Sequence, residues 1–169
     1  ACPDAVAAIL AADQIVLGPG SLYTSVLAAT AVPGIRDAVA GSTAQLVYAC
    51  NLHPQVSETT GYDVRDHVEA LRRHGLEADV VLYDPHTMGD AGGVDRAVPA
   101  ALARTSGLAH DPELLGKALV ELLDRSAAAA FRQPGSVLVG HAVVVLVAGE
   151  AGALGRLVEP GVGEGVAVG

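Results

Sequence analysis

Short apolar runs alternate with helix-length segments through the first two thirds of this chain, and this alternation restricts the fold more than any other feature. Gln14–Leu17, Gln45–Ala49 and Asp79–Tyr83 each have the length and apolar content of a buried strand. Between the last two lies Asp63–His74, whose apolar residues recur with the period of an amphipathic helix. Strands that alternate with helices predict βαβ units, and therefore an α/β fold with a mainly parallel sheet.

The loops that leave the carboxyl ends of the predicted strands are the places to look for a site. Ligands of open α/β sheets bind outside this edge. Three segments leave it here, namely Gly18–Ser21, Cys50–Leu52 and Asp84–His86. We therefore expect a site at these three loops.

The first of these loops is a glycine turn between a strand and a helix that is predicted to begin at Ser21. It lacks the GxxxxGK[ST] pattern, and Tyr23 stands where a dinucleotide fingerprint has its third glycine. Gly20 nevertheless allows close approach of the backbone, and the Ser21 and Thr24 hydroxyls add donors that suit an anion. A plain tight turn explains the same residues, so both interpretations stay open.

The second loop, residues 50–63, is unusually polar for a segment that follows a buried strand. Asn51 could bond a base or a sugar. Gln55, Glu58 and Thr59 could reach ligand hydroxyl groups. Solvation of a surface crossover also accounts for this polarity and is the simpler interpretation.

Composition narrows the possible partners. The formal net charge is −9 and the chain has no basic cluster, which disfavours nucleic acid and anionic membrane surfaces as partners. The longest apolar run, Val137–Ala148, is too short to span a bilayer. Cys2 and Cys50 match no metal or redox spacing and predict reduced thiols in a cytoplasmic protein. A homo-oligomer is left open.

Metal ligands are sparse. No pair of histidines has the spacing of a zinc site, and Asp84, which follows a strand, is a lone candidate for Mg²⁺. The sequence therefore predicts no metal site.

The chain divides by composition near residue 125. Residues 1–125 predict one globular α/β unit, whereas residues 126–169 are dominated by Ala, Val, Gly and Leu. We expect this tail to be poorly ordered, apart from a strand near residues 143–147.

Five stretches in this order resemble the carboxyl half of the YvcK/CofD-like family, the gluconeogenesis factors related to 2-phospho-L-lactate transferase. They are VLGPGSLYTSVL, AVPGIRDAV, VYACNL, QVSETTGYDVRDHVEAL and GLAHDPELLGKAL. The resemblance covers Pro3 to Leu123, and the actinobacterial type is the most similar. It implies a Rossmann-like fold of three layers.

The resemblance also implies a function. YvcK-like proteins bind UDP-sugars and act as cytoplasmic regulators of carbon metabolism, cell-wall synthesis and cell shape. The alternatives are a transferase that moves a phospholactyl group onto a deazaflavin with Mg²⁺, or an inactive fragment. Otherwise we expect no cofactor, and whether a reaction is catalysed stays open. The implied ligand-facing loop is Gly18, Gly20, Ser21, Leu22, Tyr23 and Thr24, and the implied second wall is Asn51, Gln55, Glu58 and Thr59.

Two features depart from the family pattern. The chain begins at Ala1 and lacks the GGGTG-like loop of the amino-terminal half, so we expect an incomplete fold that cannot form the whole nucleotide site. Nothing after Ser126 resembles the family, and its composition is that of a shifted reading frame or of a lineage-specific extension.

Overall fold

The computed structural model describes residues 1–131, 142–146 and 155–158. The elements in chain order are α1 (Pro3–Leu10), β1 (Gln14–Leu17), η1 (Leu22–Leu27), α2 (Ala28–Thr30), α3 (Pro33–Gly41), β2 (Gln45–Ala49), α4 (Val64–Arg73), β3 (Val80–Tyr83), α5 (Pro85–Met88), β4 (Ala97–Pro99), α6 (Pro112–Phe131), β5 (Ala142–Leu146) and β6 (Gly155–Val158).

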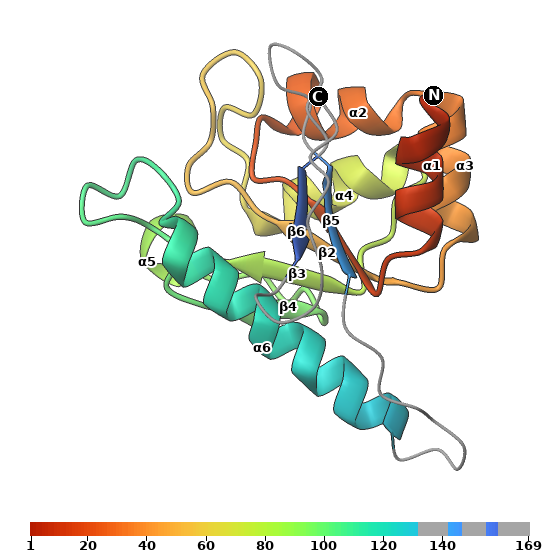
Figure 1. The fold of residues 1–169 in the computed structure, drawn as a ribbon. Helices are drawn as coiled ribbons and strands as arrows, with labels where there is room; N and C mark the ends of the chain where they lie inside the picture. Colours follow the sequence, from red (N-terminus) through yellow and green to blue (C-terminus); the bar gives the residue numbers. More distant parts are fainter. Residues whose placement is uncertain (132–141, 147–154, 159–169) are drawn as a thin grey trace.

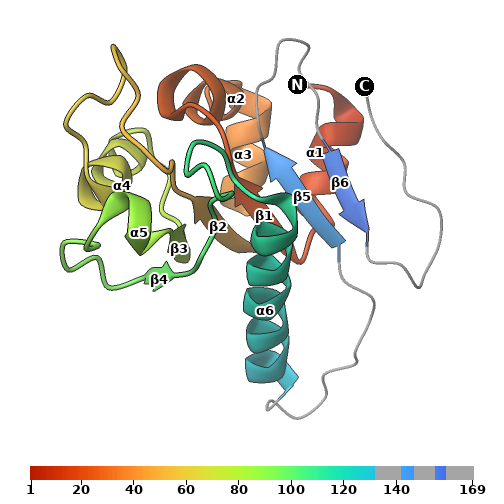
Figure 2. The same ribbon diagram turned by 90° about the vertical axis from the view of Figure 1, so that its left-hand side faces the viewer.

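The strands form one sheet in the order β4-β3-β2-β1-β5-β6 (Figures 1 and 2). The first five are mutually parallel, and β6 pairs antiparallel with β5 at one edge. Because β1, β2 and β3 are parallel neighbours, the segments that begin at Gly18, Cys50 and Asp84 leave one common edge. This confirms the α/β fold and the shared edge predicted from the alternating pattern.

Helices cover both faces of the sheet, which gives three layers (Figure 1). One core packs α1, η1, α3 and α4 against inward-facing strand residues such as Ile15 and Tyr48. A second core packs α6, through Leu115 and Leu122, against the opposite face at residues such as Val47. Burial of aliphatic side chains on both faces explains why the strands read as nearly continuous apolar runs.

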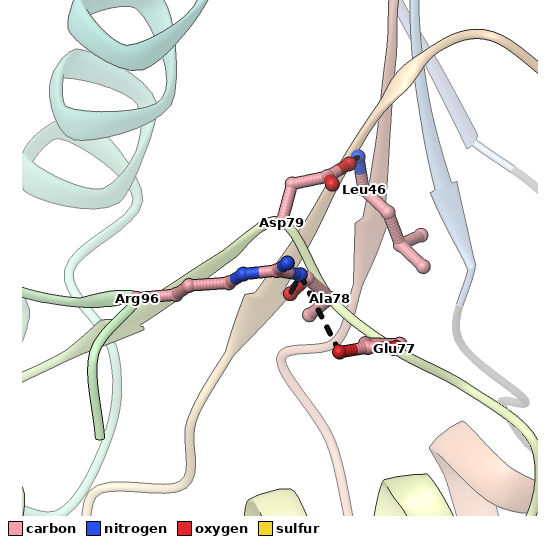
Figure 3. Close-up of polar contacts among 5 residues, drawn as sticks. All are labelled: Leu46, Glu77, Ala78, Asp79 and Arg96. Atoms are coloured by element: carbon pink, nitrogen blue, oxygen red, sulfur yellow. Dashed lines mark hydrogen bonds and ion pairs between the residues drawn. The ribbon is translucent and has the colours of Figure 1, made fainter.

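The amino ends of β2 and β3 are held together by polar groups that bond backbone atoms (Figure 3). Asp79 Oδ2 accepts a hydrogen bond from Leu46 N at 2.8 Å, which ties β3 to β2. Arg96 Nη1 donates to Ala78 O at 3.2 Å and lies 3.7 Å from Glu77 Oε1. The exposed ion pair adds little, because solvent screens it.

Helix α6 crosses the predicted boundary at residue 126 and ends at Phe131. The helix continues because residues 127–130 are all alanine, which has the highest helix propensity. The predicted strand near residues 143–147 is confirmed as β5, and β6 pairs with it. The rest of the tail lies outside the described residues, so its poor order stays a prediction. No helix in the described part of the chain is long and apolar enough to cross a membrane.

Candidate functional site

The turn after β1 depends on Gly18. Its φ is +99°, and a Cβ built on it would lie 2.9 Å from the backbone oxygen of Ala49 in β2. A side chain at this position would therefore clash with backbone and also strain the left-handed conformation. Gly20, which the sequence singled out, is not among the described residues with positive φ. Gly20 instead lines a pocket, which is described below.

The glycine turn and the polar loop, predicted separately, meet through side chains. Ser21 Oγ lies 2.7 Å from Glu58 Oε2, and Thr24 Oγ1 lies 2.7 Å from Glu58 Oε1. Ser21 follows the geometry of a helix N-cap, but its side chain makes no capping hydrogen bond. Its hydroxyl is directed to the polar loop instead, and the two loops are joined across 37 residues of sequence.

The contacts continue from Ser21 to the buried end of β2. Ser21 Oγ is 2.8 Å from Gln55 Oε1, which is 3.3 Å from Asn51 Nδ2. The Tyr48 hydroxyl lies 3.3 Å from Asn51 Oδ1. Thr59 Oγ1 accepts a hydrogen bond from Gln55 N at 2.8 Å, and this bond within the polar loop helps to hold Gln55 in place. A continuous polar network therefore runs from the sheet to the glycine turn.

An open pocket of about 240 Å³ lies beside this network at the carboxyl edge of the sheet. Gly20, Ser21, Asn51 and Gln55, all predicted site residues, contribute to its lining. The structure thus brings the core of the two predicted walls together around one hollow.

Five further lining residues were not assigned to the site from sequence, namely Leu52, His53, Pro54, Leu108 and His110. His53 Nε2 lies 2.8 Å from Gly107 O, and His110 Nε2 lies 3.2 Å from Cys50 O. Leu108 also lines the pocket and is 80% exposed, so it offers an apolar surface at the rim. Only the stretch GLAHD before α6, already part of the resemblance, could have drawn attention to Leu108 and His110.

Leu22 and Tyr23 do not face the pocket. Leu22 is fully buried in the core between the sheet and the helices. The Tyr23 hydroxyl lies 3.0 Å from the Tyr62 hydroxyl, and its ring meets His74 edge-on. Both residues anchor the start of η1, and neither is directed at the hollow that Ser21 lines.

Two groups in or beside the pocket have shifted pKa values. Hydrogen bonds from Ser21 and Thr24 lower the pKa of Glu58 below its ordinary value, so the carboxylate is ionised at neutral pH. Burial lowers the pKa of His110, which favours the neutral imidazole.

Two other residues at this edge, Asp84 and Cys50, have surroundings that limit their chemistry. Asp84 accepts backbone hydrogen bonds from Leu102 and Ala103 through Oδ2 and from His86 through Oδ1. Burial raises the pKa of Cys50 to about 12, so the thiol is protonated and is a poor nucleophile.

The Mg²⁺ ion implied by the transferase alternative does not fit these residues. The Asp84 oxygens are directed to backbone amides, and no cluster of three or more His, Cys, Asp or Glu suited to a metal occurs in residues 1–131, 142–146 and 155–158. The pocket offers hydroxyl, amide and imidazole groups beside an apolar rim. These groups suit binding of a polar organic molecule more than covalent chemistry.

The structure is that of an α/β protein with a polar pocket at the carboxyl edge of a parallel sheet. The family model described as 2-phospho-L-lactate transferase CofD matches residues 1–111. The chain therefore belongs to the CofD family.

Several named proteins are similar to part of the chain. A "Putative gluconeogenesis factor" of Thermotoga maritima is 50% identical over 80 residues, which cover 47% of this chain and 25% of the relative. The "Gluconeogenesis factor" of Halalkalibacterium halodurans is 49% identical over 79 residues, covering 45% and 24%. The chain thus spans about a quarter of the length of these curated relatives.

A crystal structure of a UPF0052 family member from Bacillus halodurans is 47% identical where it aligns. The alignment covers 48% of this chain and 27% of the other, with a TM-score of 0.46.

Proposed function

We propose that this chain supplies a UDP-sugar-binding unit of a cytoplasmic regulator of carbon metabolism, cell-wall synthesis and cell shape. The observation that carries the proposal is the network from Tyr48 through Asn51, Gln55 and Ser21 to Glu58, which borders the pocket at the carboxyl edge. A network of this kind presents hydrogen-bonding groups in fixed positions, as recognition of a hydroxyl-rich ligand requires.

The chemistry of the pocket supports a nucleotide sugar. Asn51 and Gln55 carry amides that can pair with a base or a sugar. Leu108 offers an exposed apolar surface for a ring. Gly20 leaves room for a ligand to approach the backbone. The curated relatives that carry the name gluconeogenesis factor support the regulatory part of the proposal.

A phospholactyl transferase is the second candidate, because the matching family model carries that description. The engagement of Asp84 with backbone amides weighs against it, since Asp84 was the residue that the sequence singled out as a candidate Mg²⁺ ligand. An assay for phospholactyl transfer to a deazaflavin with Mg²⁺ tests this alternative directly. We expect no product.

Titration calorimetry with UDP-N-acetylglucosamine tests the binding proposal, and we expect weak binding because the chain cannot form the whole nucleotide site. Gly20→Val should weaken binding most, because its branched side chain blocks approach to the backbone. Ser21→Ala should cost about 0.5–1.5 kcal/mol, the contribution of one neutral hydrogen bond.

Ser42→Ala is the matched control. It removes a hydroxyl that donates to Ile9 O at 3.2 Å, just before β2 and therefore at the opposite edge of the sheet. We expect it to leave binding unchanged. If Gly20→Val binds as tightly as the wild type, the turn is not part of the binding site.

A further inference from the structure

The carboxylate of Glu58 accepts hydrogen bonds from two hydroxyl groups in and just after the glycine turn. Its two oxygens lie 2.7 Å from Ser21 Oγ and 2.7 Å from Thr24 Oγ1. An ionised carboxylate can only accept hydrogen bonds, so both hydroxyls must donate to it. The donors that a phosphate would need from these two side chains are therefore already engaged.

This arrangement determines which way Ser21 faces the pocket. A serine has one hydroxyl proton, yet Ser21 Oγ has Glu58 at 2.7 Å and the Gln55 amide at 2.8 Å. The ionised carboxylate is the stronger acceptor, so the Ser21 hydroxyl donates its hydrogen bond to Glu58. Gln55 then turns its NH₂ group to Ser21. Asn51 turns its amide as well, so that Asn51 Oδ1 accepts from Gln55 and Asn51 Nδ2 donates to the Tyr48 hydroxyl; both rotations exchange nearly equivalent amide atoms. What Ser21 can still offer the pocket is an oxygen lone pair.

The described residues that line the pocket include no Lys or Arg, the positively charged side chains that bind phosphate. His53 also lines it, with Nε2 engaged by Gly107 O at 2.8 Å. His110 donates Nε2–H to Cys50 O and is favoured in its neutral form by burial. A diphosphate in this pocket would meet the negative charge of Glu58, next to Ser21, without an opposing Lys or Arg from the lining.

We propose that Glu58 determines the specificity of this pocket: acting through Ser21, it admits an uncharged, hydroxyl-bearing group and excludes phosphate. The sugar ring of the ligand enters beside Ser21, and the diphosphate lies outside the pocket. This inference rests on the proposed function and refines it. It also reverses the expectation that the hydroxyls of the glycine turn hold an anion.

The test uses two small probes on the 169-residue chain, N-acetylglucosamine as the neutral probe and inorganic phosphate as the anionic one. In Glu58→Gln the new amide donates to one of the two hydroxyls, which frees a hydroxyl proton for the pocket. We expect sugar affinity to fall about tenfold, the loss of one hydrogen bond whose acceptor is held by a charged group, and phosphate affinity to rise.

Two further variants separate specificity from structure. Glu69→Gln makes the same exchange on an exposed position of α4 and should change neither affinity. Glu58→Asp keeps the charge and should continue to exclude phosphate. If Glu58→Gln weakens both probes equally, the residue is only structural and the inference is overturned. Tighter binding of phosphate than of sugar by the wild type also overturns it, as does the failure of both probes to bind either protein.

A parallel titration with UDP-N-acetylglucosamine separates this inference from the proposed function. If the two probes behave as expected but the nucleotide sugar does not bind, the proposed function fails and the role of Glu58 stands. If the nucleotide sugar binds but Glu58→Gln changes neither probe, the role of Glu58 fails alone.

Discussion

Two carboxylates near the same edge of the sheet are held in different ways. Asp84 is 2% exposed and bonds the backbone amides of three residues at 2.7–3.0 Å. Glu58 is half-buried and bonds the side-chain hydroxyls of Ser21 and Thr24 at 2.7 Å. Asp84 links backbone segments to each other, whereas Glu58 links two side chains, of which Ser21 lines an open pocket.

This difference makes Asp84 a structural carboxylate, whereas the hydrogen bonds of Glu58 can change when a ligand binds. Backbone amides cannot turn away from Asp84, so removing it leaves buried donors without partners. Hydroxyl groups can rotate, and water or a ligand can replace Glu58 as their partner. The two sites should therefore respond oppositely to mutation, with loss of stability at Asp84 and a change of binding preference at Glu58.

The largest expected effect is on folding, from Asp84→Ala. This variant leaves the amides of Leu102, Ala103 and His86 without their acceptor and should lower the free energy of unfolding by about 3 kcal/mol. Urea denaturation measures this loss. Asp90→Ala is the control, since Asp90 is exposed and accepts one bond from Gly92 N at 2.8 Å. A loss as small as that of the control would remove the distinction between the two carboxylates.

The same residue should impose a pH dependence on stability. Burial acts to raise the pKa of Asp84, but the backbone hydrogen bonds outweigh it and hold the pKa below its ordinary 3.8. The contribution of Asp84 is therefore present above this value and is lost as pH falls through the lower folded pKa. Urea midpoints between about pH 5 and pH 2 should fall less steeply in Asp84→Asn than in the wild type. Equal slopes would show that Asp84 does not titrate as described.

The next effect concerns the backbone beneath the pocket. Gly18→Ala forces a Cβ to within 2.9 Å of Ala49 O at a φ of +99°, so we expect a loss of about 1–3 kcal/mol. Gly41→Ala is the control, because a Cβ there meets no atom within 4 Å. Thermal unfolding compares the two variants. Equal stabilities would mean that the turn tolerates a side chain at Gly18.

The smallest effect on stability should come from Glu58→Gln, the counterpart of Asp84→Ala. Its partners are hydroxyls that solvent can reach, so the free energy of unfolding should change by less than about 1 kcal/mol. Urea denaturation checks this value on the variant used for the binding tests. A loss as large as that of Asp84→Ala would make Glu58 a structural residue as well.

The sequence predicted the sheet better than the site, and the reason is physical. β1 and β2 were predicted to the residue, because an apolar run between helices has few other places in an α/β fold. The shared edge followed from the parallel order. Such patterns are local, because the apolar run that predicts a strand lies within the strand itself.

Side-chain directions in the loops could not be predicted in the same way. The contact of Ser21 with Glu58 joins residues 37 apart in sequence, and no local pattern encodes it. Leu22 was assigned to the ligand-facing loop with its neighbours. Its apolar side chain is typical of a core residue, and Leu22 is indeed buried in the core. His110 approaches from a segment 60 residues beyond Cys50. Tertiary packing decides these positions.

Amide chemical shifts of the ¹⁵N-labelled chain during titration with UDP-N-acetylglucosamine test the central claim most directly. The largest changes should cluster at Gly20–Thr24 and Asn51–Thr59, the two walls at the carboxyl edge. Changes confined to the opposite edge, around Leu76–Asp79 and Arg96, or no changes at all, would contradict the account.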